Sequence, residues 1–142
     1  MSEVSESEAI ALARERLELS PTTVASASRV ARIDPPGGTY YLIVLGDPGA
    51  ALGVAAVDAA SGEVTHWATL PGERPHVLLD RETAARRARP SSGRQPRLVW
   101  RSSPASRSPF YPLWEVDTGE KTVYVDQEGR VWPSLESSAG GG

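Results

Sequence analysis

The 142-residue chain contains no cysteine. Disulfide frameworks, thiolate nucleophiles and cysteine-ligated metal sites are therefore excluded. No apolar stretch approaches the 18 residues that a membrane-spanning helix needs. The first residues, MSEVSESEAIALARERL, lack a basic start followed by an apolar run, so we expect no signal peptide. These absences predict a cytoplasmic protein without a membrane contact.

Lysine is also scarce, with Lys121 as its one occurrence, and arginine supplies the remaining positive charge. The charge is unevenly distributed. Residues 1–79 carry 5 basic and 10 acidic side chains, residues 80–107 carry 8 arginines and 2 acidic side chains, and residues 108–142 carry 2 basic and 6 acidic side chains. Such a basic block indicates either a nucleic-acid patch or a segment that acidic neighbours neutralise within the fold. The net charge of −3 favours the second interpretation.

The first half of the chain has the pattern of one helix followed by strands. Ser5 and Glu8 have the spacing of a capping box, and apolar residues at helical spacing follow them. We therefore expect a helix over residues 6–19, ended by Pro21. Turn residues rich in Gly, Pro and Asp then separate four β-prone runs. These predicted strands are 23–33, 39–45, 51–58 and 63–70.

The second half follows PGERP at residues 71–75, a segment whose Pro and Gly residues interrupt regular secondary structure. A second helix is expected within 77–90, with Asp80 as its N-cap and Pro90 at its end. Glu82 suits its N-terminal end, whereas Arg86, Arg87 and Arg89 suit its C-terminal end. A strand is predicted at 97–103. The stretch YPLWEVDTGEKTVYVDQEGRVW (111–132) then gives three strands separated by the turns DTGE and DQEG.

The two halves share their order of elements. Val57-Asp58 followed by Gly62 corresponds to Val125-Asp126 followed by Gly129, at an offset of 67 to 68 residues. This indicates an internal repeat. We therefore predict an α+β fold of two repeated units, each a helix packed on an antiparallel β-meander of three to four strands. The predicted boundaries are 1–72 and 73–136, with a disordered tail at 137–142.

The pattern of the repeat resembles the PepSY domain in two tandem copies. The residues that carry this resemblance in the first half are Glu8, Ala9, Tyr41, Val57, Asp58, Gly62 and Val64. In the second half they are Glu82, Ala85, Tyr111, Val123, Val125, Asp126, Gly129 and Val131. The resemblance implies an α+β unit with a non-catalytic role in inhibiting or regulating partners. Many members of that family are secreted or membrane-attached, which this sequence does not suggest.

No motif in the sequence predicts catalysis. His66 and His76 are the only histidines, and no second metal ligand accompanies either at a familiar spacing. An enzyme is indicated only if one of them lines a deep polar pocket. Asp58 and Asp126 precede turns, where an aspartate organises backbone N–H groups. We therefore predict no catalytic residue, metal or cofactor.

The remaining candidate surface combines arginine with aromatic side chains, as partner-binding surfaces do. The four tryptophans are expected mainly in the core. The candidate partner-binding residues are Arg97, Trp100, Arg101, Arg107, Phe110 and Trp114. The sequence predicts a non-enzymatic, inhibitor- or immunity-like protein that binds an unknown protein partner, with a homodimer also possible. The alternative is a small-ligand or nucleic-acid binding module that uses the Arg-rich stretch 81–107.

Overall fold

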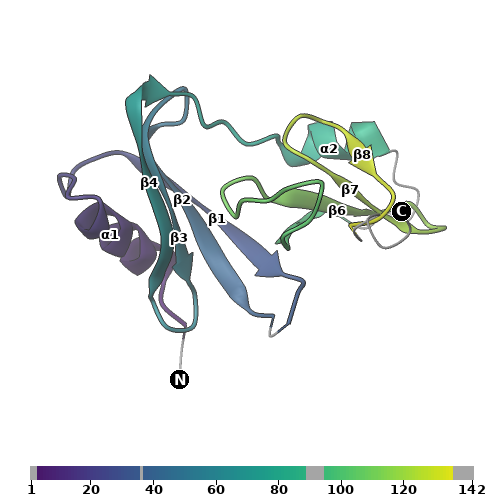
Figure 1. The fold of residues 1–142 in the computed structure, drawn as a ribbon, viewed down its shortest axis with the longest axis horizontal. Coiled ribbons are helices and arrows are strands. Elements are labelled where there is room, and N and C mark those ends of the chain that lie inside the picture. Colours follow the sequence, from purple (N-terminus) through teal and green to yellow (C-terminus); the bar gives the residue numbers. More distant parts are fainter. Residues whose placement is uncertain (1–2, 36, 89–94, 136–142) are drawn as a thin grey trace. The chain divides into compact units, whose positions relative to one another are not determined.

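A computed structural model describes residues 3–35, 37–88 and 95–135 (Figure 1). It contains two short helices and eight strands in this part of the chain. The elements are α1 (Glu6–Arg16), β1 (Ala25–Arg32), β2 (Thr39–Asp47), β3 (Ala50–Asp58), β4 (Val64–Arg74), α2 (Arg81–Ala88), β5 (Arg97–Trp100), β6 (Leu113–Asp117), β7 (Thr122–Val125) and β8 (Val131–Trp132).

The described residues form two compact units. Unit 1 comprises residues up to Arg32 and from 37 to Val77, and unit 2 comprises 33–35 and the residues from Leu78 onward. The chain therefore passes into unit 2 between Val77 and Leu78, five residues after the boundary predicted at 72/73. Arg89, Pro90 and the predicted tail 137–142 lie outside the described residues.

Unit 1 is built on four antiparallel strands in the order β4-β3-β2-β1. The apolar run of β2 is buried on both faces. Tyr41 and Ile43 contribute to the core beneath α1, and Tyr40 and Leu42 on the opposite face are also buried. This explains why β2 shows a continuous apolar run rather than an alternating pattern.

Helix α1 packs on the sheet of unit 1 through small residues (Figure 1). Ala9 and Ala13 are fully buried, and Leu17 reaches the sheet at Gly53. A Cβ atom on Gly53 would lie 2.3 Å from Leu17 Cδ2, so the close approach depends on the missing side chain. The capping box of Ser5 and Glu8 is confirmed.

The helix ends earlier than predicted, at Arg16 rather than residue 19. Glu18 adopts a left-handed backbone conformation with φ of 56°, and the Leu19 N–H donates to the Arg14 carbonyl at 2.8 Å. This turn satisfies a carbonyl at the helix end. The chain is thus already out of the helix before Pro21.

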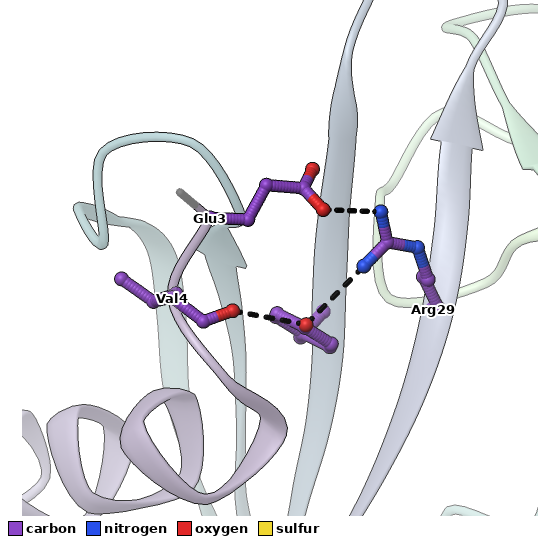
Figure 2. Close-up of polar contacts among 4 residues, drawn as sticks. Glu3, Val4 and Arg29 are labelled. Atoms are coloured by element: carbon purple, nitrogen blue, oxygen red, sulfur yellow. Dashed lines mark hydrogen bonds and ion pairs between the residues drawn. The ribbon is translucent and has the colours of Figure 1, made fainter. Parts of the chain in front are cut away.

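The residues before α1 are tied to the sheet by a small polar cluster (Figure 2). Arg29 on β1 forms an ion pair with Glu3 at 2.6 Å and donates a hydrogen bond to the Tyr41 hydroxyl at 3.2 Å. That hydroxyl donates to the Val4 carbonyl at 3.0 Å. The Val4 N–H also donates to the Ala59 carbonyl at 2.8 Å. The N-terminal segment is therefore held to β1, to β2 and to the residue after β3.

Strand β4 is irregular on both sides of its centre. The register shifts between Ala56 and Val57, where two steps on β4 oppose one on β3. It shifts again between Ala51 and Gly53, whose partners Arg74 and Thr69 are five residues apart. Glu73 within the second irregularity has φ of 50°. Regular pairing with β3 is thus confined to the middle of the strand.

Unit 2 contains the strands β5-β6-β7-β8, each antiparallel to the next, and the helix α2. The core beneath α2 contains Ala84 with Trp114, Val116, Val123 and Val125. Tyr111 and Val131 lie outside this core and are exposed by 51% and 43%. The core of this unit is accordingly small.

Helix α2 begins at its predicted cap. Asp80 Oδ1 accepts a hydrogen bond from the Thr83 N–H at 2.7 Å, which confirms Asp80 as the N-cap. The residue before the cap bonds to a strand instead of to the helix: the Leu79 carbonyl accepts a hydrogen bond from Trp114 Nε1 at 2.7 Å. The helix therefore does not extend back to residue 77.

The prediction of two repeated helix-plus-meander units is wrong. The only helices of the described residues are the two short ones, and sheet dominates both units. The elements also differ in size: β1 to β4 have 8, 9, 9 and 11 residues, whereas β5 to β8 have 4, 5, 4 and 2. The matching Val-Asp and Gly positions arise from similar turn chemistry in strands of unequal length.

Candidate protein-binding site

The turn between β7 and β8 is organised by Asp126, which is 7% exposed. Its Oδ1 atom accepts hydrogen bonds from the N–H groups of Glu128 and Arg130, both at 2.9 Å. Its Oδ2 atom accepts from Trp132 Nε1 at 2.9 Å. The predicted turn role of Asp126 is thereby confirmed. Asp58 has the same role in unit 1, where its Oδ2 accepts from the Ser61 N–H and hydroxyl.

The long connection between β5 and β6, residues 101–112, is organised around Ser106. The Ser106 hydroxyl accepts from Trp100 Nε1 at 3.2 Å and lies 2.6 Å from the Tyr111 carbonyl oxygen, to which it donates. Ser103 and Ser106 exchange two backbone hydrogen bonds of 3.0 and 3.1 Å. The connection is therefore an ordered loop, although it has almost no regular secondary structure.

Gln127 joins this loop to the turn. Its Nε2 donates to the Pro112 carbonyl at 2.7 Å, and its Oε1 accepts from the Leu79 N–H at 2.5 Å. Both ends of the amide are therefore engaged with backbone groups. The end of loop 101–112, the β7–β8 turn and the approach to α2 are consequently linked by one side chain.

A cavity of about 570 Å³ lies between loop 101–112 and the turn 126–130, and we call it the loop–turn cavity. The residues that matter for its chemistry are Pro104, Arg107, Tyr111, Asp126, Arg130 and Trp132. Arg107 comes from the loop and Arg130 from the turn. Tyr111 and Trp132 supply aromatic surface. The cavity thus brings together two guanidinium groups and two aromatic rings from separate segments.

The two arginines differ in how they are engaged. Arg107 is exposed, and within the described part of the chain no ion pair occupies its guanidinium group. Arg130 lies 3.3 Å from Glu128, with both side chains at least 70% exposed. An ion pair this exposed contributes only about 0.2–1 kcal/mol. Both guanidinium groups are therefore available to an anionic group that enters the cavity.

The six residues predicted from the sequence are placed in different surroundings. Arg107 lines the loop–turn cavity, whereas Arg97 on β5 pairs with Glu115 at 2.7 Å. Trp100 and Trp114 are each 7% exposed, and their indole N–H groups donate to Ser106 and Leu79. Their role in this fold is structural. The other two predicted residues are Arg101, which is half-buried just after β5, and Phe110, which is half-buried in the loop.

The described arginines of the stretch 81–107 do not gather into one patch. Arg81 lies over the Trp114 ring at 5.7 Å, and Arg86 donates to the Thr83 hydroxyl at 3.3 Å. Arg87 packs against the backbone at Gly129. Arg89 and Arg94 lie outside the described residues. The described arginines of the stretch are thus distributed over α2, β5 and the loop.

The histidines do not line the loop–turn cavity. His66 is exposed on β4 beside the Thr65 hydroxyl, and the backbone N–H of the buried His76 donates to the Pro48 carbonyl at 2.7 Å. No three His, Asp or Glu side chains among the described residues are grouped so as to hold a metal ion. The absence of catalytic residues, metal and cofactor stays a prediction.

Sequence reasoning did not identify Tyr111, Arg130 and Trp132 as site residues. Each was assigned to the strands and turns of the stretch 111–132. One signal was present: an Arg and a Trp closely follow the turn that ends in Gly129, so the end of the turn could have been expected to present both. Their opposition to Arg107 depends on the path of loop 101–112, which no local pattern predicts.

Comparisons with known proteins add little. No family model matches the chain, and no curated protein matches it. A solved structure described as a putative lipoprotein from Clostridium difficile 630 is 14% identical and covers 92% of this chain and 91% of that chain, with a TM-score of 0.36. A likeness at that score carries no argument about fold or function.

The unequal strands of the two units contradict the internal repeat, and no family model supports the resemblance to the PepSY domain. Among the residues described, no helix is long and apolar enough to cross a membrane. The cytoplasmic location stays a prediction.

Proposed function

We propose that this protein is a non-enzymatic binding protein that holds an acidic segment of a protein partner in the loop–turn cavity. One observation carries the proposal: Arg107 and Arg130 reach the cavity from separate segments, together with the aromatic rings of Tyr111 and Trp132. Arginine, tyrosine and tryptophan are the residues most enriched at energetically important positions of protein interfaces. An inhibitor or regulator of its partner would need no further chemistry.

The polar groups of the cavity favour recognition over catalysis because the fold already uses them. Both oxygens of Asp126 accept hydrogen bonds from the turn and from Trp132. The Gln127 amide and the Ser106 hydroxyl are bonded to backbone groups. A general base or nucleophile needs a group that can reach substrate. The guanidinium groups and the aromatic rings of the cavity are the groups that remain to contact a ligand.

The charge of the cavity favours a carboxylate over a nucleic-acid backbone. Glu128 stands at the rim beside Arg130, and Asp126 lies in the wall. A polyphosphate chain would encounter these carboxylates, and the whole protein has a net charge of −3. A single carboxylate needs only one or two arginines, and Arg binds it through a planar fork of donors. An acidic peptide segment with an apolar or aromatic neighbour fits both features.

A peptide-display selection with the whole protein as bait tests the proposal. We expect the selected peptides to contain Asp or Glu beside an aromatic or aliphatic residue. Binding of a selected, fluorescein-labelled peptide should weaken about two- to fivefold in Arg107→Ala, as for loss of one exposed ion pair. Tyr111→Ala should also weaken it, because an aromatic contact is lost. Arg86→Ala is the matched control, since it removes the same charge from α2.

Two results would contradict the proposal. The first is a set of selected peptides without acidic residues, or with affinities that Arg107→Ala leaves unchanged. The second is tighter binding of single-stranded DNA than of any peptide, with the steep salt dependence of phosphate contacts. That outcome would favour the nucleic-acid alternative.

A further inference from the structure

Glu128 lines the loop–turn cavity and forms an ion pair with one of its two arginines. Its carboxylate lies 3.3 Å from the Arg130 guanidinium group, and both side chains are at least 70% exposed. Arg107 and Arg130 supply the positive charges of the lining, whereas Asp126 and Glu128 supply the negative ones. Among the described residues that line the cavity, positive and negative charges are therefore equal in number. A ligand that brings only carboxylates disturbs this balance.

The turn fixes the backbone positions of both members of the pair. Asp126 Oδ1 accepts hydrogen bonds from the N–H groups of Glu128 and Arg130, both at 2.9 Å. These bonds involve the backbone of the two residues and not their side chains. Both side chains can therefore turn from each other toward a ligand while the turn stays intact. Little opposes such an exchange, because an exposed pair of this kind contributes only about 0.2–1 kcal/mol.

The two carboxylates of the cavity differ in what they can offer to a cation. Asp126 is 7% exposed, and its two oxygens accept hydrogen bonds from the turn and from Trp132 Nε1. The Glu128 side chain is 72% exposed and is engaged by the equally exterior Arg130. Glu128 is therefore the carboxylate of the lining that a basic group of a ligand can reach.

A ligand with an acidic residue alone would leave Glu128 in unfavourable surroundings. If the ligand carboxylate pairs with Arg130, Glu128 loses its partner and lies beside another negative charge. Like charges brought together at an interface disfavour the complex. A basic residue close to the acidic one removes this cost, because it pairs with Glu128 while the acid pairs with Arg130. One ion pair within the protein is then replaced by two ion pairs across the interface.

We propose that the partner segment carries a basic residue close to its acidic residue, and that Glu128 selects for this combination. The inference rests on the proposed function and specifies its ligand: a segment with neighbouring charges of opposite sign and an apolar or aromatic residue beside them. The two groups that would receive these charges lie 3.3 Å apart in the free protein, so the charges of the ligand must also be neighbours. In an extended segment, a basic residue six positions away would lie about 20 Å from the acidic one, too far to pair with Glu128.

Fluorescein-labelled dodecapeptides with an uncharged background of Ser and Leu test this inference by fluorescence anisotropy. The reference peptide carries a single Asp beside a Trp. Further peptides add one Lys at one, two or six positions from the Asp, and matched peptides carry Gln in its place. We expect a Lys at one or two positions to tighten binding about two- to fivefold relative to Gln. The Lys at six positions measures the attraction to the protein's net charge of −3 and should give a smaller gain.

Three variants show whether Glu128 causes the preference. Glu128→Gln should remove the advantage of the near Lys, and it should bind the reference peptide about two- to fivefold more tightly, because Arg130 has lost its competing carboxylate. Glu128→Lys should reverse the preference, so that Glu in place of the near Lys binds more tightly. Glu120→Gln is the matched control, since it removes the same charge from the exposed turn between β6 and β7. It should leave the preference for the near Lys unchanged.

The results separate the two proposals. If a near Lys gives no advantage over Gln, or gives the same advantage in Glu128→Gln, Glu128 does not select the ligand. The proposed function then still stands if Arg107→Ala weakens the binding of the acidic peptides. If none of these peptides binds, or if Arg107→Ala has no effect on them, both proposals fail. Circular dichroism spectra of each variant show whether a loss reflects unfolding.

Discussion

The contact between Gly53 and Leu17 gives the most direct test of how α1 is seated on the sheet. In Gly53→Ala the new Cβ would lie 2.3 Å from Leu17 Cδ2 and 3.0 Å from the Ala68 carbonyl oxygen. Both distances are shorter than ordinary van der Waals contacts, so Leu17 must leave its position or α1 must move. Overpacking of this kind costs about 1–3 kcal/mol. The loss of glycine from the unfolded chain offsets about 0.4–1 kcal/mol of that cost.

We therefore expect Gly53→Ala to lower the free energy of unfolding by roughly 1–2 kcal/mol, measured by urea denaturation followed by circular dichroism. Leu17→Ala alone should cost about 2–5 kcal/mol, because it removes a largely buried side chain. In the double variant the new methyl group occupies space that Leu17 has vacated. The cost of Gly53→Ala should then nearly disappear, which corresponds to a coupling energy of about 1–2 kcal/mol.

The control is Gly49→Ala in the β2–β3 turn, where the new Cβ would meet only Asp47 Oδ1 at 3.3 Å. It should change stability by less than about 0.5 kcal/mol. Equal costs of Gly53→Ala with and without Leu17 would refute the reasoning. The conflict would then lie with the backbone of β4 rather than with the helix.

Two further predictions concern the helices. Glu18→Gly should raise the free energy of unfolding by about 1 kcal/mol in thermal or urea denaturation, because the φ of 56° is strained for any residue with a Cβ atom. Glu18→Ala serves as the control for the lost carboxylate. A Gly variant that is no more stable than the Ala variant would contradict this prediction. The Asp80 carboxylate has a pKa lowered from 3.8, first by the backbone N–H of Thr83 and then by its hydroxyl and Arg86. Its stabilising effect is therefore complete above pH 3.8 and is lost as the pH falls through the folded pKa. The difference in melting temperature between wild type and Asp80→Asn should then shrink below pH 3.8. A constant difference from pH 7 to pH 2.5 would count against the ionised carboxylate as the cause.

Local features of the fold were predictable wherever neighbouring residues determine them. The capping box of Ser5 and Glu8, the cap at Asp80 and the turn aspartates Asp58 and Asp126 all depend on partners a few positions away. Strand β2 was recognisable from its β-branched and aromatic run. In each case one short segment contains both the side chain and the group that it binds.

The candidate site was not predictable in the same way. Trp100 and Trp114 were predicted to bind a partner, but their N–H groups are satisfied by Ser106 and by Leu79, which is 35 residues from Trp114. The cavity depends on loop 101–112 lying against the β7–β8 turn, an arrangement held by Gln127. Long-range contacts of this type leave no periodic pattern in the sequence.

The irregular pairing of β4 also bears on how the protein behaves at high concentration. In unit 1 strand β4 pairs with β3, in unit 2 strand β8 pairs with β7, and each lies at an edge of its unit's strands. The outer edge of a sheet is a template for adding a strand from another molecule. On β4 the unbroken register spans only residues 66–69 between the two shifts, and β8 has two residues. A foreign strand could gain only a few hydrogen bonds at either end. The bends of β4 and the shortness of β8 therefore disfavour growth by strand addition at these edges.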